Sequence, residues 1–258
     1  VVTETAGSQA GATIVLMHGG GQPRHSWGTA LRTFAAAGYR TIAYDARGHG
    51  ESQWAEDGDY TFAALAADLK AILKDVEGPV ALVGASMGGM IGQIIAAKYP
   101  KRVLSLGVLF SSNNQPMLPP PHPKAFFPLI KGPGAKAPRD VLLNHSVKLF
   151  TAIGSPAHPM TPDEIRVFAG GLMDRSFHPA GVKRHFLAVM GTGNIKSLAK
   201  SIHVPTIVVH GKEDRLLRPA CGKAVAKSIK GAKFELIEGM GHDIPNALAP
   251  RLANLFAG

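Results

Sequence analysis

The sequence predicts an α/β fold in which a mostly parallel sheet is covered by helices on both faces. Short apolar runs rich in β-branched residues alternate with longer amphipathic segments, a pattern typical of parallel sheets. The alternation stops after residue 110 and resumes near residue 206. We therefore expect a mainly helical insertion within one α/β domain.

Six segments are expected to form strands, because each is a short apolar run bounded by turn-forming residues. In chain order they are Thr13–Met17, Tyr39–Tyr44, Val80–Val83, Val103–Phe110, Thr206–His210 and Lys233–Ile237. Unbroken apolar runs of this kind are typical of strands that are buried on both faces. Most of these strands should therefore lie inside the sheet.

Five segments that follow strands are expected to form helices. In chain order they are Ser26–Ala37, Thr61–Val76, Gly88–Tyr99, Pro219–Ile229 and Asn246–Phe256. The second is the clearest, because Phe62, Leu65 and Leu69 recur at spacings of three and four residues. Asp68 and Lys70 fall on its opposite side, as expected of a helix with one face in water.

Residues 115–196 are predicted to be the insertion, with residues 1–114 and 197–258 forming the core domain. The insertion holds 12 of the 19 prolines and carries 10 Lys/Arg against 4 Asp/Glu. Weaker helical patterns occur at Arg139–Thr151, Pro162–Met173 and Pro179–Met190. Because open α/β sheets bind ligands at the carboxyl ends of their strands, we expect this segment to be a cap, or lid, that sets substrate selectivity. The alternative is an elaborate crossover without a role at the site.

Composition and charge exclude several classes of protein. A chain of 258 residues, 45% hydrophobic and 18% charged, can bury a core without a metal or disulfides. Cys221 is the single cysteine, which excludes a disulfide scaffold and a cysteine-based zinc site. No apolar run approaches the roughly 20 residues of a membrane span, and no secretory signal is visible. A cytoplasmic location is expected, although a chain that begins with Val1 is also compatible with removal of an upstream segment.

The net charge of +10 is uneven, since residues 1–97 hold 6 Lys/Arg and 9 Asp/Glu, whereas residues 98–258 hold 22 and 9. The basic residues are scattered singly or in pairs rather than in one run. This distribution favours a surface biased toward anions over a specific nucleic-acid partner.

The strongest chemical signal is Gly84-x-Ser86-x-Gly88, which lies between a predicted strand and a predicted helix. A turn this tight requires small residues two positions before and after the serine, and it exposes the serine Oγ on a strained backbone. It also aims the backbone N–H of Met87 toward a substrate oxygen. We therefore expect Ser86 to be a nucleophile, the alternative being a purely structural turn.

A second signal is the glycine run that follows the first predicted strand, His18-Gly19-Gly20-Gly21. Glycines allow a ligand to approach the backbone and to reach its N–H groups. A nucleotide loop is disfavoured because the chain has neither G-x-G-x-x-G nor Gly-Lys-Ser/Thr. His18 is expected to support the loop rather than to act as a base.

A base and an acid are expected in the loops after the last two strands. His242 follows the final strand and Asp214 follows the preceding one, so both leave the sheet edge that carries Ser86. The chain order Ser86, Asp214, His242 is one of the three known orders of a catalytic triad. Glu213 is the rival acid. The rival bases are His49, His185 and His210; the insertion also holds His122, His145, His158 and His178, which are expected to be mainly solvated.

Together these motifs resemble the α/β-hydrolase-fold serine hydrolases, a family that includes esterases and cofactor-free perhydrolases. The matching stretches, in family order, are His18–Gly21, Asp45–Ser52, Gly84–Gly89, His210–Asp214 and Gly241-His242. The resemblance covers nearly the whole chain and implies a sheet of about seven to eight strands, with Asp45–Ser52 as a structural turn near the site. One departure is that only 12 residues precede Thr13, which leaves room for at most one short edge strand before it.

The resemblance implies acyl transfer without a metal or organic cofactor. Ser86 would attack a carbonyl, His242 would move the proton, and Asp214 would orient the imidazole. The N–H groups of Gly20 and Met87 would form the oxyanion hole. Relatives that open epoxides or displace halide carry an aspartate in place of the serine, so neither reaction is expected.

The leading function is hydrolysis of a small to medium carboxylic ester, thioester or lactone, as in a carboxylesterase. Three alternatives remain: a cofactor-free perhydrolase or haloperoxidase with the same triad, a carbon–carbon bond hydrolase, and a ligand receptor that has lost turnover. Candidate substrate contacts are Gly21, Phe126, Phe127, Phe150 and Phe168, with Met117, Met160, Met173 and Met190 as further apolar side chains. The alternative for the side chains of the insertion is that they fill its own core. We expect the insertion to contribute nothing to the triad.

Overall fold

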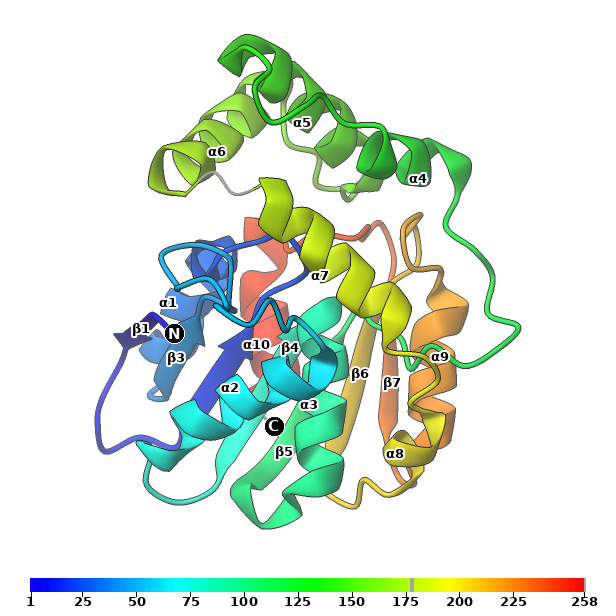
Figure 1. Cartoon of the computed structure of the whole chain (residues 1–258). Helices are drawn as coiled ribbons and strands as arrows, with labels where there is room; N and C mark the ends of the chain where they lie inside the picture. The colour runs from blue at the N-terminus through cyan, green and yellow to red at the C-terminus, as the bar shows by residue number, and fades with distance from the viewer. Residues whose placement is uncertain (177–178, 258) are drawn as a thin grey trace.

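The computed structural model describes residues 1–176 and 179–257 and shows one seven-stranded sheet with helices on both faces (Figure 1). The strands are β1 (Thr3–Ala6), β2 (Thr13–Met17), β3 (Arg40–Tyr44), β4 (Val80–Ala85), β5 (Val103–Leu109), β6 (Thr206–Gly211) and β7 (Lys233–Ile237). They lie in the order β1-β3-β2-β4-β5-β6-β7. All six predicted strands are present, with bounds that differ by two residues or fewer.

The seventh strand, β1, is the short edge strand for which the sequence leaves room. It pairs antiparallel with β3, from Thr3 opposite Tyr44 to Ala6 opposite Thr41, whereas every other pair is parallel. Most of its residues are exposed, so it lacks the apolar run by which the other strands were predicted. A short, polar edge strand also discourages pairing with another chain.

The core lies in two layers, one on each side of the sheet. On β2, Val15 and Met17 point into one layer, while Ile14 and Leu16 point into the other. This alternation is that of a strand buried on both faces. The first layer is covered by α2 (Phe62–Lys74), α3 (Met87–Lys98), α8 (Lys196–Lys200) and α9 (Pro219–Ser228), and the second by α1 (Gly28–Ala36) and α10 (Ala249–Ala257).

The register of the six parallel strands brings the loops that follow them to one edge of the sheet. Met17 lies opposite Gly84 and Ala85 lies opposite Leu109, while Gly211 lies opposite Ile237. Met17 also lies opposite Tyr44, so the loops that follow β2, β3, β4, β5, β6 and β7 leave the sheet at the same edge. These loops include every residue predicted for the triad and the oxyanion hole.

The segment 115–196 forms four helices beyond this edge, before the chain reaches α8. They are α4 (Pro123–Ile130), α5 (Arg139–Ile153), α6 (Pro162–Arg175) and α7 (Pro179–Gly191). In Figure 1, α4 to α6 lie above the carboxyl ends of the strands and α7 runs obliquely between them and the sheet. Proline at the start of a helix costs no hydrogen bond, and α6 is also closed by a capping box between Thr161 and Glu164.

Helix α4 was not predicted, and its omission is a correction to the sequence analysis. The proline-rich run 117–123 argues against a helix in the sequence, but Pro123 stands in the first turn of α4, where its fixed φ suits a helix. His122 caps this helix by accepting a hydrogen bond from the N–H of Lys124 at 3.2 Å. Among the residues described, no helix is both long and apolar enough to cross a membrane.

Candidate active site

Ser86 stands at a sharp turn between β4 and α3, as its motif predicts. Its backbone has φ 51° and ψ −114°, in the left-handed region that L-residues seldom adopt. A Cβ on Gly84 would overlap the carbonyl oxygen of Gly88, and a Cβ on Gly88 would overlap that of Met17. Both glycines are therefore required by the turn, which holds the half-buried Ser86 at the carboxyl edge of the sheet.

Three predicted residues from three loops form one hydrogen-bonded chain. His242 Nε2 lies 3.1 Å from Ser86 Oγ, and His242 Nδ1 lies 2.7 Å from Asp214 Oδ2. A carboxylate can only accept, so Nδ1 carries the proton and Nε2 is left to accept the serine hydroxyl. This is the geometry that a general base needs to activate a nucleophile.

Asp214 is buried and fully hydrogen-bonded. Its Oδ1 accepts the backbone N–H groups of Leu216 and Leu217 at 2.8 and 2.9 Å. Burial alone would raise the pKa of Asp214, but the charge of His242 and the hydrogen bonds from His210 and His242 lower it below its usual range. The carboxylate is therefore ionised at neutral pH and is able to stabilise an imidazolium.

Neither the rival acid Glu213 nor the neighbouring Asp243 forms a hydrogen bond with the His242 ring in the described residues. The carboxylate oxygen Oε2 of Glu213 is buried without a hydrogen-bond partner in the described residues. The carboxylate of Asp243 accepts the hydroxyl of Ser155, and burial raises the pKa of Asp243. Asp214 is thus the carboxylate that the structure pairs with His242.

The loop that carries His242 is hydrogen-bonded to the end of α5 and the residues that follow it. The His242 N–H donates to the Ile153 carbonyl at 2.7 Å, and the Gly241 N–H donates to Ser155 Oγ at 2.9 Å. The insertion supplies no triad side chain, yet it holds the backbone of the base. Sequence reasoning missed this contribution because backbone contacts between distant segments leave no motif.

Phe110, the residue after β5, packs against the His242 ring. The two ring centroids are 4.6 Å apart, and Phe110 is buried. Its φ of 33° is also in the left-handed region, which a bulky residue adopts only when its surroundings hold it there. Phe110 entered the sequence analysis only as the end of a strand.

The glycine loop after β2 lies beside the start of α3. A Cβ on Gly20 would be 3.8 Å from the Sδ atom of Met87, so the two predicted oxyanion donors belong to neighbouring backbone segments. The N–H groups of the first helical turn have no partner within the helix and carry partial positive charge. Their role as an oxyanion hole stays a prediction.

His18 is buried beneath this loop and holds it. Its Nδ1 lies 2.7 Å from the Gly19 carbonyl, and its Nε2 accepts the Ala46 N–H at 2.9 Å. Burial lowers the pKa of His18, so the ring is neutral at neutral pH. These contacts are those of a loop-supporting residue.

The rival bases lie elsewhere. His185, on α7, accepts the Gly21 N–H at 3.4 Å and stacks on His49 with ring centroids 3.7 Å apart. Burial, together with His18, lowers the pKa of His185 to about 3. His210 contacts Asp214 rather than Ser86. The structure therefore brings His242, and not these three, to the serine.

Helix α7 forms a side of the site that sequence reasoning missed. A Cβ on Gly21 would lie 3.1 Å from Val182 Cγ1, and a Cβ on Gly181 would overlap the Gly48 carbonyl oxygen. Thus α7 packs against both the glycine loop and the turn formed by Asp45–Ser52. The helical pattern of α7 was visible in the sequence, but its position beside Gly21 was not.

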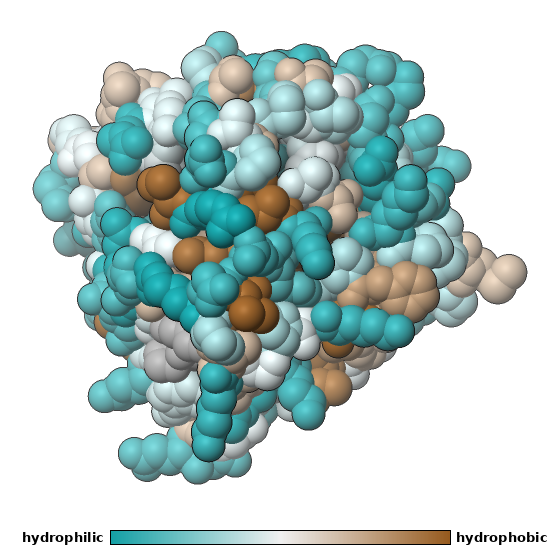
Figure 2. Space-filling view, turned by 90° about the horizontal axis from the view of Figure 1, so that it is seen from above, coloured by the Kyte–Doolittle hydropathy of each residue, from teal (hydrophilic) through white to brown (hydrophobic). Residues whose placement is uncertain are grey.

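The aromatic candidates of the insertion contact one another. Phe150 and Phe168 meet edge to face with centroids 5.6 Å apart, and Phe126 lies 6.2 Å from Phe127. The first pair joins α5 to α6, which favours the alternative that these rings fill the core of the insertion. Viewed from above (Figure 2), the surface over this segment is mostly hydrophilic with scattered apolar side chains, and Met117, Phe127, Met160 and Met190 are exposed.

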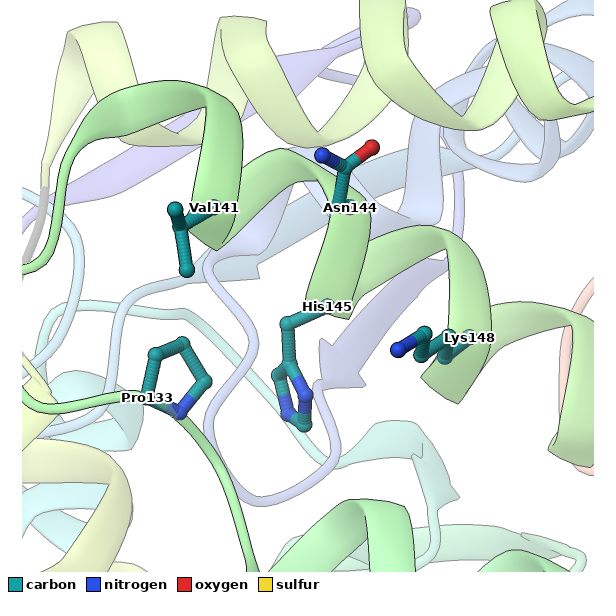
Figure 3. Close-up of a pocket in the computed structure, with 5 residues that line it drawn as sticks. All are labelled: Pro133, Val141, Asn144, His145 and Lys148. Atoms are coloured by element: carbon teal, nitrogen blue, oxygen red, sulfur yellow. The ribbon is translucent and has the colours of Figure 1, made fainter.

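Among the histidines of the insertion, His145 borders a separate cavity (Figure 3). The cavity has a volume of about 250 Å³ and is lined by Pro133, Val141, Asn144, His145 and Lys148. It lies between α5 and the loop before it, and no triad residue lines it.

His122 caps α4, and His178 lies outside the described residues. Within the described ranges, no group of three His, Cys, Asp or Glu side chains is placed to hold a metal ion.

The chain belongs to the alpha/beta hydrolase family, which matches residues 14–253. Non-heme chloroperoxidase CPO-A1 of Kitasatospora aureofaciens is 29% identical over 241 residues, which cover 91% of this chain and 86% of that protein. The bifunctional esterase/perhydrolase DCH of Acinetobacter calcoaceticus is 25% identical over 254 residues, covering 94% and 89%. The predicted family is therefore confirmed.

Solved structures confirm the predicted fold. The meta-cleavage product hydrolase of Pseudomonas fluorescens IP01 matches with a TM-score of 0.79 at 16% identity, and the match covers 99% of this chain and 90% of that chain. At this sequence identity, the match shows a shared fold and nothing about activity. The expected number of strands, about seven to eight, agrees with the seven described here.

Proposed function

We propose that this chain is a serine hydrolase that cleaves a small to medium carboxylic ester, thioester or lactone. The observation that carries the proposal is the continuous hydrogen-bond chain from Asp214 through His242 to Ser86. It ends at a half-buried hydroxyl beside the first turn of a helix. This arrangement supports Ser86 as the nucleophile, His242 as the base and Asp214 as the acid of an acyl transfer.

In the proposed reaction, Ser86 Oγ attacks the substrate carbonyl while His242 Nε2 takes the hydroxyl proton. The oxyanion accepts hydrogen bonds from the N–H groups of Met87 and Gly20, each of which is worth on the order of 10² to 10³ in kcat. His242 then returns the proton to the leaving alcohol or thiol. Water, activated by the same imidazole, releases the acid, and Asp214 stabilises the imidazolium in both steps.

We further propose that residues 115–196 act as the cap of this site. The support is the contact of α7 with Gly21 and the attachment of α5 to the His242 loop. A segment in this position borders the space in front of Ser86. Its side chains, Val182 first among them, would then discriminate between acyl groups.

Covalent labelling tests the proposed nucleophile. A fluorophosphonate should add one group to the chain, on the peptide that contains Ser86, and Ser86→Ala should remove both labelling and ester turnover. A screen of p-nitrophenyl esters graded by acyl length, beside lactones and thioesters, would then define the substrate class. Labelling at another residue, or turnover that survives in Ser86→Ala, would refute the assignment.

A perhydrolase is the second candidate, and the similarity to CPO-A1 and DCH favours it. The same three residues would form the acyl-enzyme, and hydrogen peroxide instead of water would attack it to give a peracid. Bromination measured in acetate with peroxide, beside ester hydrolysis by the same preparation, separates the two activities. A receptor that only binds its ligand is excluded by any turnover that depends on Ser86.

A further inference from the structure

Asp214 faces two imidazoles, and the reaction described above uses only one of them. Its Oδ2 lies 2.7 Å from His242 Nδ1 and 3.3 Å from His210 Nε2. The side chains of Asp214 and His210 have no exposed surface. The second imidazole is therefore a permanent neighbour of the catalytic acid.

The surroundings of His210 fix its orientation and its tautomer. Nε2 also lies 2.7 Å from the Leu217 carbonyl oxygen, so both of its neighbours are acceptors and Nε2 must carry a proton. On the other side of the ring, a Cβ on Gly222 would overlap Nδ1. Nδ1 has no hydrogen-bond partner in the described part of the chain. The ring is thus packed between α9 and the turn after β6, with Nε2 hydrogen-bonded to the Leu217 carbonyl and 3.3 Å from Asp214 Oδ2.

We propose that His210 is a positioning residue that holds the Asp214 carboxylate in the orientation in which Oδ2 meets His242. By binding the Leu217 carbonyl, His210 closes the turn 214–217, whose N–H groups hold Oδ1. By donating to Oδ2, it takes up part of the negative charge that His242 would otherwise face alone. The inference rests on the proposed function, since it assigns Asp214 to the triad.

The direction in which loss of the His210 donor changes the stability of the protonated His242 ring can be predicted. With His210 Nε2–H gone, Asp214 Oδ2 directs more of its charge to His242, so the imidazolium is stabilised and keeps its proton to a higher pH. Among the described residues, Asp243 and Cys221 are further ionisable groups that interact with this pair. Both are unchanged in a substitution at position 210, so their contributions cancel in the comparison.

Three substitutions at position 210 distinguish the loss of the Nε2–H donor from the loss of the ring volume. His210→Gln places an amide N–H near the position of Nε2 and keeps the donor. His210→Asn places its amide near Nδ1, where it reaches neither acceptor, and His210→Phe keeps the ring without any donor. If the phenylalanine variant fails to fold, the glutamine and asparagine pair still gives the comparison.

The first measurement is the pH dependence of kcat/KM with p-nitrophenyl acetate. The acid limb of the wild-type profile is the reference for the variants. His210→Phe and His210→Asn should lower kcat about tenfold and move the limb up by about half a pH unit. His210→Gln should recover most of both changes. A merely structural role would lower kcat in all three variants without moving the limb, and that result would overturn the proposal.

The second measurement needs no substrate. Protein with ¹⁵N-labelled histidine is titrated by NMR, and the His242 ring is assigned by its absence in His242→Gln. The His242 midpoint should rise in His210→Asn and His210→Phe and stay near the wild-type value in His210→Gln. If ester turnover is absent, the proposed function fails, yet this titration still decides the role of His210. An unchanged midpoint in every variant contradicts that role.

Discussion

Replacing Asp214 with asparagine should disable the base while leaving the volume of the side chain almost unchanged. The amide oxygen has to remain toward Leu216 and Leu217, because both present N–H donors at 2.8 and 2.9 Å. The amide NH₂ then faces His242 Nδ1, which must accept instead of donate. The imidazole proton moves to Nε2, where it faces Ser86 Oγ and blocks proton uptake from the hydroxyl.

The expected loss in kcat is large because the asparagine side chain favours the His242 tautomer that cannot take the serine proton. A fall in kcat on the order of 10⁴ corresponds to about 5.4 kcal/mol of transition-state stabilisation. The assay is saturation kinetics with the best p-nitrophenyl ester of the screen, together with the rate of fluorophosphonate labelling. The labelling rate should fall in parallel, because phosphonylation requires the same base.

The matched control is Asp243→Asn, on the residue that follows His242. The Asp243 carboxylate accepts the Ser155 hydroxyl and not the imidazole, and an amide oxygen preserves that hydrogen bond. The expected loss in kcat is less than about tenfold, the range in which one ordinary hydrogen bond falls. The reasoning is refuted if Asp243→Asn costs more than Asp214→Asn, or if Asp214→Asn stays within tenfold of the wild type. Glu213→Gln tests the remaining acid.

Three further predictions concern the elements around the triad. Ser155→Ala removes the acceptor of the Gly241 N–H and should lower kcat about tenfold with little change in KM, whereas unchanged steady-state kinetics would contradict a positioning role. His185 is neutral when folded, with a pKa of about 3, so protonation of the unfolded chain below about pH 6.5 should cost stability as the pH falls, by about 1.4 kcal/mol per pH unit for each proton. In urea unfolding between pH 7 and 4, His185→Gln should show a shallower loss than the wild type, and equal slopes would count against it. Val182→Ala should raise turnover of longer acyl esters several-fold relative to acetate, while Phe168→Ala should mainly lower Tm. The same acyl-length profile is measured for Phe126→Ala, Phe127→Ala and Phe150→Ala. If none of the five variants alters that profile, residues 115–196 are a crossover and not a cap.

The elements that the sequence predicts well are those with local causes. β2 is a short buried run inside the sheet, and the turn at Ser86 requires the two glycines that flank it. The order of the loops then limits where a base and an acid can come from. β1 and α4 were not predicted. β1 is exposed and polar, so it lacks an apolar run, and α4 begins inside a proline-rich stretch that argues against a helix.

The remaining features depend on contacts between segments far apart in the chain. Nothing near Ser155 in sequence indicates that its hydroxyl serves the Gly241 N–H. His210 belongs to a recognisable motif, but only the packing against Gly222 shows that its ring turns toward Asp214. His185 and Val182 share a predicted helix, yet the docking of that helix on the glycine loop was not visible. Such contacts are set by tertiary packing, which local patterns do not encode.

The attachment of α5 to the His242 loop constrains how substrate enters. Three hydrogen bonds join residues 153–157 to residues 239–242, from Ile153 to His242, from Ser155 to Gly241 and from Ala157 to Gly239. If the end of α5 swung outward as a rigid flap, it would either break these bonds or draw the imidazole away from Ser86. An open conformation of that kind would be unable to acylate. Under the proposed function, substrate would therefore enter past another part of the rim, or the site would become competent only after α5 had closed again.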